Sequence, residues 1–100
     1  MTDYKWVKIN IGKAIKFYRQ QNGLKQWQLA ELTGISQSYL SEIERGKKVP
    51  SFFTLIDIAD KIGVDFWDLL IPLELPMNVK TAIKLLLQIE RNELDELNKS

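Results

Sequence analysis

The polar side chains best placed to do chemistry in this chain lie on one face of a predicted helix at residues 36–45. The helical period turns Leu40 and Ile43 inward and exposes a polar set: Gln37, Ser38, Ser41, Glu42 and Arg45. A glutamine amide can bond bidentately to N6 and N7 of adenine, a serine hydroxyl can serve several bases, and a carboxylate can accept from N4 of cytosine. These residue types favour contact with nucleic acid bases. An ordinary solvated helix face is the alternative.

The residue types that usually carry catalysis and metal binding are missing. The chain has no cysteine and no histidine, so zinc sites lose their usual ligands and catalytic triads lose their usual base. The sequence has no glycine-rich phosphate loop, and its acidic residues do not pair around a pocket. We therefore expect no enzyme activity, no cofactor and no metal site.

The composition predicts one soluble domain with a modest core. The chain has 100 residues, of which 45% are hydrophobic and 27% charged. Its first residues lack the apolar stretch of a signal peptide, and no run approaches the roughly 20 apolar residues of a membrane span. Together with the absence of cysteine, these features predict a cytoplasmic protein without membrane contact.

Charge is distributed unevenly along the chain. The net charge is only +1, but residues 1–50 hold nine Lys and Arg against four Asp and Glu, while residues 51–100 hold five against nine. A basic half joined to an acidic half predicts that the first half meets a polyanion. A chance distribution of charges is the alternative.

Apolar periodicity, capping residues and glycines predict an all-α chain. Five helices are expected at residues 11–22, 26–33, 36–45, 51–62 and 65–70, and glycines follow four of them. The expected N-caps include Asn10, Ser36 and Asp65, and Asp68 is placed to answer Asp65 in a capping box.

The C-terminal segment has a different character. After a connector at residues 72–77, a broad apolar face recurs at helical spacing: Val79, Ala82, Ile83, Leu86, Leu87, Ile89, Leu94 and Leu97. One bent helix or two short helices fit this pattern equally. Several acidic residues follow near the end of the chain: Glu90, Glu93, Asp95 and Glu96.

The helices at 26–33 and 36–45, separated by a short turn with Gly34, have the spacing of a helix-turn-helix motif. In this motif the first helix directs its N-terminal amides at phosphate, and the second lies in the major groove of DNA.

Landmarks in order run through three fifths of the chain: Ile11-Gly12, Ile15, Tyr18-Arg19, Gly23-Leu24, Gln26, Leu29-Ala30, Gly34-Ile35-Ser36, Leu40 to Gly46, Pro50-Ser51, Leu55, Ile58-Ala59 and Gly63-Val64. With them, residues 11–70 resemble the Cro- and lambda-repressor-like helix-turn-helix domain, the XRE family. The resemblance implies a five-helix DNA-binding domain, here followed by one or two amphipathic helices.

The resemblance also assigns roles to individual residues. Gln26 matches the family's phosphate-binding glutamine, and Gln37 and Ser38 match its principal base-reading positions. We expect further base contacts from Ser41 and Glu42, although Glu42 could instead pair with Arg45. Phosphate contacts are expected from four basic residues: Lys25, Arg45, Lys47 and Lys48. Lys25 replaces the family's usual Ser or Thr helix cap, and Trp27 replaces a polar residue.

Other positions are expected to be structural. Arg19 and Glu44 match an ion pair that bridges the first and third helices, and Phe52 and Phe66 match core positions. Phe53 and Trp67 stand where the family is usually polar, so we expect them to contact residues 78–97 of the same or a partner subunit.

These features predict three segments: a DNA-binding domain at 1–71 with its core at 11–70, the connector at 72–77, and a helical dimerisation segment at 78–100. The expected dimer residues are apolar: Phe53, Trp67, Ile83, Leu86, Leu87, Leu94 and Leu97. Alternatively, the last segment completes the monomer's own core.

The predicted function is a bacterial or phage transcriptional regulator, most simply a repressor, that binds a near-palindromic double-stranded operator as a homodimer in the nucleoid. A protein antagonist or a toxin is a further expected type of partner. The alternatives are an antitoxin or restriction-modification controller of the same fold, and an interaction module that has lost DNA binding.

Overall fold

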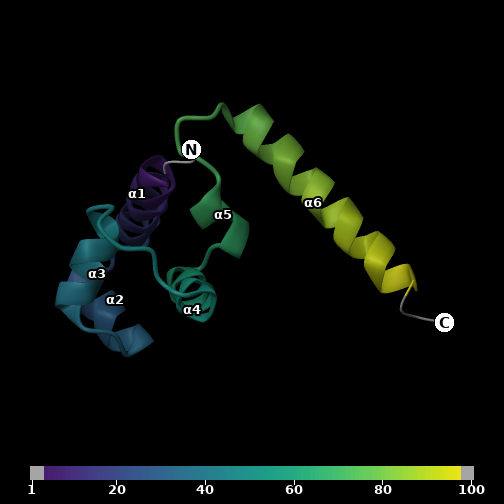
Figure 1. The fold of residues 1–100 in the computed structure, drawn as a ribbon. Coiled ribbons are helices and arrows are strands. Elements are labelled where there is room, and N and C mark those ends of the chain that lie inside the picture. The colour runs from purple at the N-terminus through teal and green to yellow at the C-terminus, as the bar shows by residue number, and fades with distance from the viewer. Residues whose placement is uncertain (1–3, 98–100) are drawn as a thin grey trace.

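The structure, a computed structural model, describes residues 4–97, and the side chains of these residues except 90–95 and 97. The described chain holds six helices and no strand: α1 Lys5–Gln21, α2 Gln26–Thr33, α3 Gln37–Glu44, α4 Phe52–Ile62, α5 Phe66–Leu70 and α6 Met77–Leu97. Helices α1 to α5 gather into one body, and α6 extends from its α5 side (Figure 1). The all-α prediction is therefore confirmed.

Local capping explains where most of these helices begin. The Ser36 hydroxyl accepts a hydrogen bond from the backbone N–H of Tyr39 at 3.0 Å, which caps α3. At α5, the Asp68 carboxylate accepts from the N–H of Asp65 at 3.0 Å, as the predicted capping box requires. Capping thus fixes the first turn of α3, where the candidate base-reading residues lie.

The prediction for the start of α1 is wrong. Asn10 does not cap this helix, because α1 begins at Lys5 and Asn10 lies within it. Val7 packs against the core one turn before the buried Ile11, so the apolar face of the helix continues upstream of Asn10. Packing of an amphipathic face stabilises a helix more than a local capping preference does.

One hydrophobic core joins all five helices of the body. Its fully buried large side chains are Ile15, Leu29, Leu40, Ile43, Ile58 and Leu69. Helix α1 packs against α3, α4 and α5, and α2 packs against α3 and α4. The core therefore holds α2 and α3 in a fixed relation, with the outer face of α3 free.

Phe66 packs against this core, as expected. The expectation that Phe52 is also a core residue is wrong, because Phe52 is 58% exposed. Phe52 is the first residue of α4 and lies one turn before Leu55, where the buried face of the helix begins. Its ring packs edge-to-face on Phe66 with 5.0 Å between centroids. Phe52 thus covers the rim of the core.

Residues 77–97 form a single helix, which decides between the two expected arrangements. Helix α6 is tied to α5 by Lys84, whose Nζ donates to Asp68 at 2.9 Å and lies 3.6 Å from Asp65. The hydrogen bond to Asp68 raises the pKa of Lys84 above its ordinary value. Burial, together with the charge of Asp68, raises the pKa of Tyr18. Within the described residues, no helix has the length and apolar content needed to cross a membrane.

Helices α1 and α3 approach each other closely at Gly12. A Cβ atom at this position would overlap the backbone carbonyl oxygens of Ile43 and Glu44, the latter at 2.8 Å. Both obstacles are backbone atoms, so neither can rotate away. Gly12 therefore permits the helix contact that places the end of α3.

Gly12→Ala should lower the free energy of unfolding by about 1–3 kcal/mol, because the new methyl group pushes α1 and α3 apart. Urea denaturation followed by circular dichroism measures this. Lys16→Ala, on the exposed face of the same helix, is the control and should leave the midpoint nearly unchanged. Equal midpoints for the two variants would contradict the proposed close approach.

Candidate nucleic-acid interface

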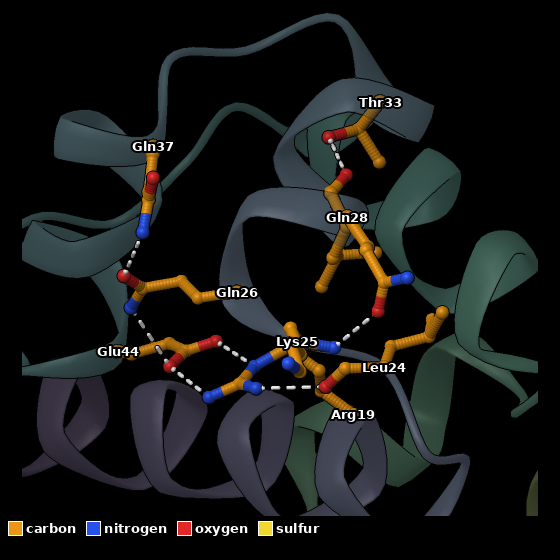
Figure 2. Close-up of polar contacts among 9 residues, drawn as sticks. Arg19, Leu24, Lys25, Gln26, Gln28, Thr33, Gln37 and Glu44 are labelled. Carbon is orange, nitrogen blue, oxygen red and sulfur yellow. Dashed lines mark hydrogen bonds and ion pairs between the residues drawn. The ribbon is translucent and has the colours of Figure 1, made fainter.

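The turn between α2 and α3 sets the geometry of the candidate interface. Gly34 adopts a left-handed conformation with φ of +71°, and the N–H of Ile35 donates to the carbonyl of Ala30 at 3.1 Å. The Thr33 hydroxyl donates to the Leu29 carbonyl at 2.8 Å (Figure 2). These bonds end α2 sharply and redirect the chain into α3. The two helices therefore have the arrangement that the spacing predicts.

The first turn of α3 presents its polar residues outward. Gln37 and Ser38 are exposed, and Ser41 and Glu42, one turn later, are half-buried. The exposed Arg45, Lys47 and Lys48 follow the end of the helix, and Lys25, also exposed, precedes α2. Polar hydrogen-bonding groups are thus bordered by positive charge at both ends of the motif, a pattern that suits a polyanion carrying bases.

Two glutamines of this surface are joined to each other. Nε2 of Gln37 donates to Oε1 of Gln26 at 3.4 Å, and Nε2 of Gln26 donates to Oε1 of Glu44 at 3.2 Å (Figure 2). A carboxylate accepts only, so Glu44 sets which end of the Gln26 amide faces it. The oxygen of Gln26 is then directed at Gln37. The amide of Gln37 keeps its own oxygen and one further N–H for a ligand.

The inner end of this series of hydrogen bonds is a buried ion pair. Nε and Nη2 of Arg19 donate to the two carboxylate oxygens of Glu44 at 2.7 and 2.9 Å, and the two side chains are only 8% and 4% exposed. Nη1 of Arg19 also donates to the carbonyl of Leu24 at 2.9 Å. This bidentate geometry connects α1, the loop before α2 and the end of α3. Among the described residues, no buried side-chain polar atom is left without a partner.

Glu42 pairs with Lys48, and not with Arg45 as the alternative prediction had it. Nζ of Lys48 lies 3.5 Å from Oε2 of Glu42 and 5.9 Å from the ring centroid of Tyr39. Nε of Arg45 donates instead to the carbonyl of Ser41 at 3.3 Å. The lysine partly compensates a carboxylate that would otherwise repel phosphate.

The N-terminal end of α2 lies next to the polar first turn of α3, because Gln26 bonds to Gln37. The side-chain oxygen of Gln28 accepts from the backbone N–H of Lys25 at 2.8 Å, which fixes the first turn although Lys25 itself has no capping oxygen (Figure 2). The Lys25 side chain is exposed, and Trp27, which is half-exposed, follows two residues later in the sequence.

The expected dimer residues occupy different environments. Ile83 and Leu87 are half-buried, and Leu87 lines a groove together with Trp67. Phe53 and Leu86 are strongly exposed. Both Leu94 and Leu97 belong to α6, but their side chains lie outside the described part of the structure. In the part of the chain that the structure describes, no cluster of acidic residues could hold a metal ion.

Sequence reasoning missed the hydrogen bonds from Gln26 to Glu44 and from Lys84 to Asp68. The members of each pair lie 18 and 16 residues apart on different helices. Helical periodicity relates only residues on the same helix, so it carries no signal for either contact.

Known proteins match the part of the chain that holds this interface. The helix-turn-helix family matches residues 15–66. An uncharacterized HTH-type transcriptional regulator, y4dJ of Sinorhizobium fredii, is 36% identical over 62 residues, which are 62% of this chain and 80% of that protein. The immunity repressor protein of Bacillus phage phi105 is 41% identical over 56% of this chain, but the match spans only 39% of the repressor.

A solved structure supports the similarity to helix-turn-helix regulators. The master regulator for biofilm formation SinR, crystallised in complex with DNA, is 39% identical, with a TM-score of 0.58. The match covers 61% of this chain and 98% of the SinR chain. The match to SinR concerns less than two thirds of this chain, whereas the match to the clp gene regulator ClgR from Corynebacterium glutamicum covers 91% of it.

Glu44→Ala should lower the free energy of unfolding by about 3–5 kcal/mol, because it leaves the Arg19 guanidinium buried without its counter-charge. Thermal and urea unfolding measure the loss. As a control, Lys61→Ala breaks only the partly solvent-exposed pairs of Lys61 with Asp57 and Asp60 on α4 and should barely shift the midpoint. A Glu44→Ala protein as stable as the control would show that the buried pair does not hold the helices together.

Proposed function

The chain belongs to the helix-turn-helix family and is a DNA-binding transcriptional regulator of the Cro- and lambda-repressor-like type; from this premise we propose that it represses transcription by binding a near-palindromic operator as a homodimer. The observation that carries the proposal is the exposed first turn of α3, where Gln37 bonds to Gln26, in a motif with basic residues before α2 and after α3. Residues 1–71 would bind DNA and residues 78–100 would join two subunits.

Base reading is assigned to the outer face of α3. With this helix in the major groove, its N-terminal residues meet the base edges first. The oxygen and the second N–H of the Gln37 amide match the donor and acceptor of adenine, and Ser38 lies beside them. Ser41 and Glu42 would reach bases one turn further along the groove. Since Lys48 partly compensates Glu42, that carboxylate can approach cytosine at a reduced electrostatic cost.

Phosphate binding is assigned to the two ends of the motif. The N-terminus of α2 presents unpaired amides and a positive dipole end, with Lys25 and Gln26 at this point. Arg45, Lys47 and Lys48 would neutralise phosphates at the other end of α3. Such contacts fix the register of the protein on the duplex without reading sequence.

A second copy is needed because one motif reads too few base pairs for specific binding at cellular salt concentrations. Two motifs related by a dyad reach half-sites about 34 Å apart, one turn of DNA. Helix α6 extends from the α5 side, with α2 and α3 across the body from it (Figure 1), so contacts through α6 leave α3 accessible. A dimer bound over a promoter would repress by excluding polymerase.

Gln37→Ala should relax base preference at one position of each half-site, with a loss of about 1–3 kcal/mol of discrimination there. Lys47→Ala should weaken binding to all sequences alike and reduce the salt dependence. The measurement is selection of bound sequences from a random duplex library, followed by fluorescence anisotropy at several salt concentrations.

Two matched controls accompany these variants. Gln88→Ala on α6 and Lys61→Ala on α4 remove the same side-chain types away from the motif and should bind like the parent protein. If the selected pool shows no dyad-symmetric consensus and binding stays weak at low salt, the protein is an interaction module and the proposal fails.

A further inference from the structure

A groove with a volume of about 510 Å³ is lined by residues of α4, α5 and α6. Its apolar lining comes from all three helices: Phe52, Ile56, Phe66, Trp67 and Leu87. A largely apolar concave surface of this volume is typical of sites that hold a small organic molecule. None of the lining residues belongs to α2, to α3 or to the loops beside them, so the groove is separate from the candidate nucleic-acid interface.

Three aromatic rings lie together in this lining. Phe66 packs edge-to-face on Phe52, with 5.0 Å between centroids, and on Trp67, with 5.4 Å. Phe52 is 58% exposed, so much of its surface is available to a ligand. The face of an aromatic ring carries partial negative charge and attracts cations, most strongly in tryptophan. The rings therefore favour a ligand that combines an apolar body with a positive charge.

The charged groups at the groove favour the same sign of ligand. Lys84 is the only cationic residue among the described residues that line it, and its Nζ lies 2.9 Å from Asp68 and 3.6 Å from Asp65. Two carboxylates thus face one ammonium group. Asp68 also accepts from the backbone N–H of Asp65 with its second oxygen, whereas the Asp65 side chain is 73% exposed. A cation therefore meets an accessible carboxylate, and an anion meets an excess of negative charge.

We propose that this groove binds a small organic cation with an apolar body. The aromatic rings hold the body of the ligand, and the Asp65 carboxylate pairs with its charged group. A molecule seated there contacts both the five-helix body and α6. This inference goes beyond the proposed function, because neither operator binding nor dimer formation requires a small ligand.

Tetraphenylphosphonium and tetraphenylborate are suitable probes, because they have nearly the same size and shape but opposite charges. Isothermal titration calorimetry of the full chain without DNA should give a dissociation constant below about 1 mM for tetraphenylphosphonium. Tetraphenylborate should bind the groove more weakly, since the two ions differ mainly in the sign of their charge.

Phe52→Ala shows whether the probe binds in the groove. It should weaken tetraphenylphosphonium binding about two- to fivefold, the usual worth of a cation–π contact at an exposed site. The matched control is Phe17→Ala, because Phe17 is also partly exposed (43%) and packs edge-to-face on Tyr18, but lies outside the groove. Phe17→Ala should bind the probe like the parent protein.

Asp65→Asn tests the charged partner. It should weaken tetraphenylphosphonium binding by up to about fivefold, and asparagine can still cap α5. The matched control is Asp60→Asn, because the Asp60 side chain is 75% exposed and lies 3.4 Å from Nζ of Lys61, away from the groove. Unchanged circular dichroism would show that all four variants remain folded.

Three results would overturn the proposal: no binding of tetraphenylphosphonium, equal losses in the groove variants and their controls, or tetraphenylborate binding that is as tight and that Phe52→Ala also weakens. None of the four substituted residues is assigned to DNA contact or to the dimer. Failure of this test therefore leaves the proposed function standing, and a failed operator selection leaves the ligand site standing.

Discussion

The buried pair of Arg19 and Glu44 is the interaction on which the rest of the structure depends. Two charges with side chains almost excluded from water must satisfy each other, because either alone would carry an uncompensated desolvation cost. Their bidentate contact fixes the end of α3 against α1, at the place where Gly12 lets the two backbones approach. The orientation of α3 is therefore set from inside the domain.

The same pair reaches the surface through hydrogen bonds. One oxygen of Glu44 accepts from Gln26, and Gln26 accepts from Gln37, so a buried carboxylate determines the direction of two surface amides. In the proposed complex, a Gln37 side chain held in this way would lose less rotamer freedom when DNA binds. On this proposal, the same network would serve both stability and recognition. In the proposed dimer, the pairing of subunits would depend instead on α6, which extends from the α5 side of the body (Figure 1).

The sequence predicted local structure well where the signals were local. The bounds of α2, the caps at Ser36 and Asp65 and the end of α4 at Gly63 all follow from capping and glycine chemistry within a few residues. Asn10 and Phe52 were misassigned because tertiary packing overrides a capping preference and because a periodic pattern does not show where the core ends. The contact from Gln26 to Glu44 depends on the docking of two helices, which no spacing along the chain reveals.

The measurement that tests this account most directly is a double-mutant cycle on the selected operator, with Gln26→Ala, Gln37→Ala and the double variant. If Glu44 orients Gln37 through Gln26, the two losses in binding free energy are non-additive by about 0.5 kcal/mol or more. Gln26→Ala alone should also relax the base preference assigned to Gln37. Losses that add within about 0.3 kcal/mol, with the base preference intact in Gln26→Ala, would contradict the account.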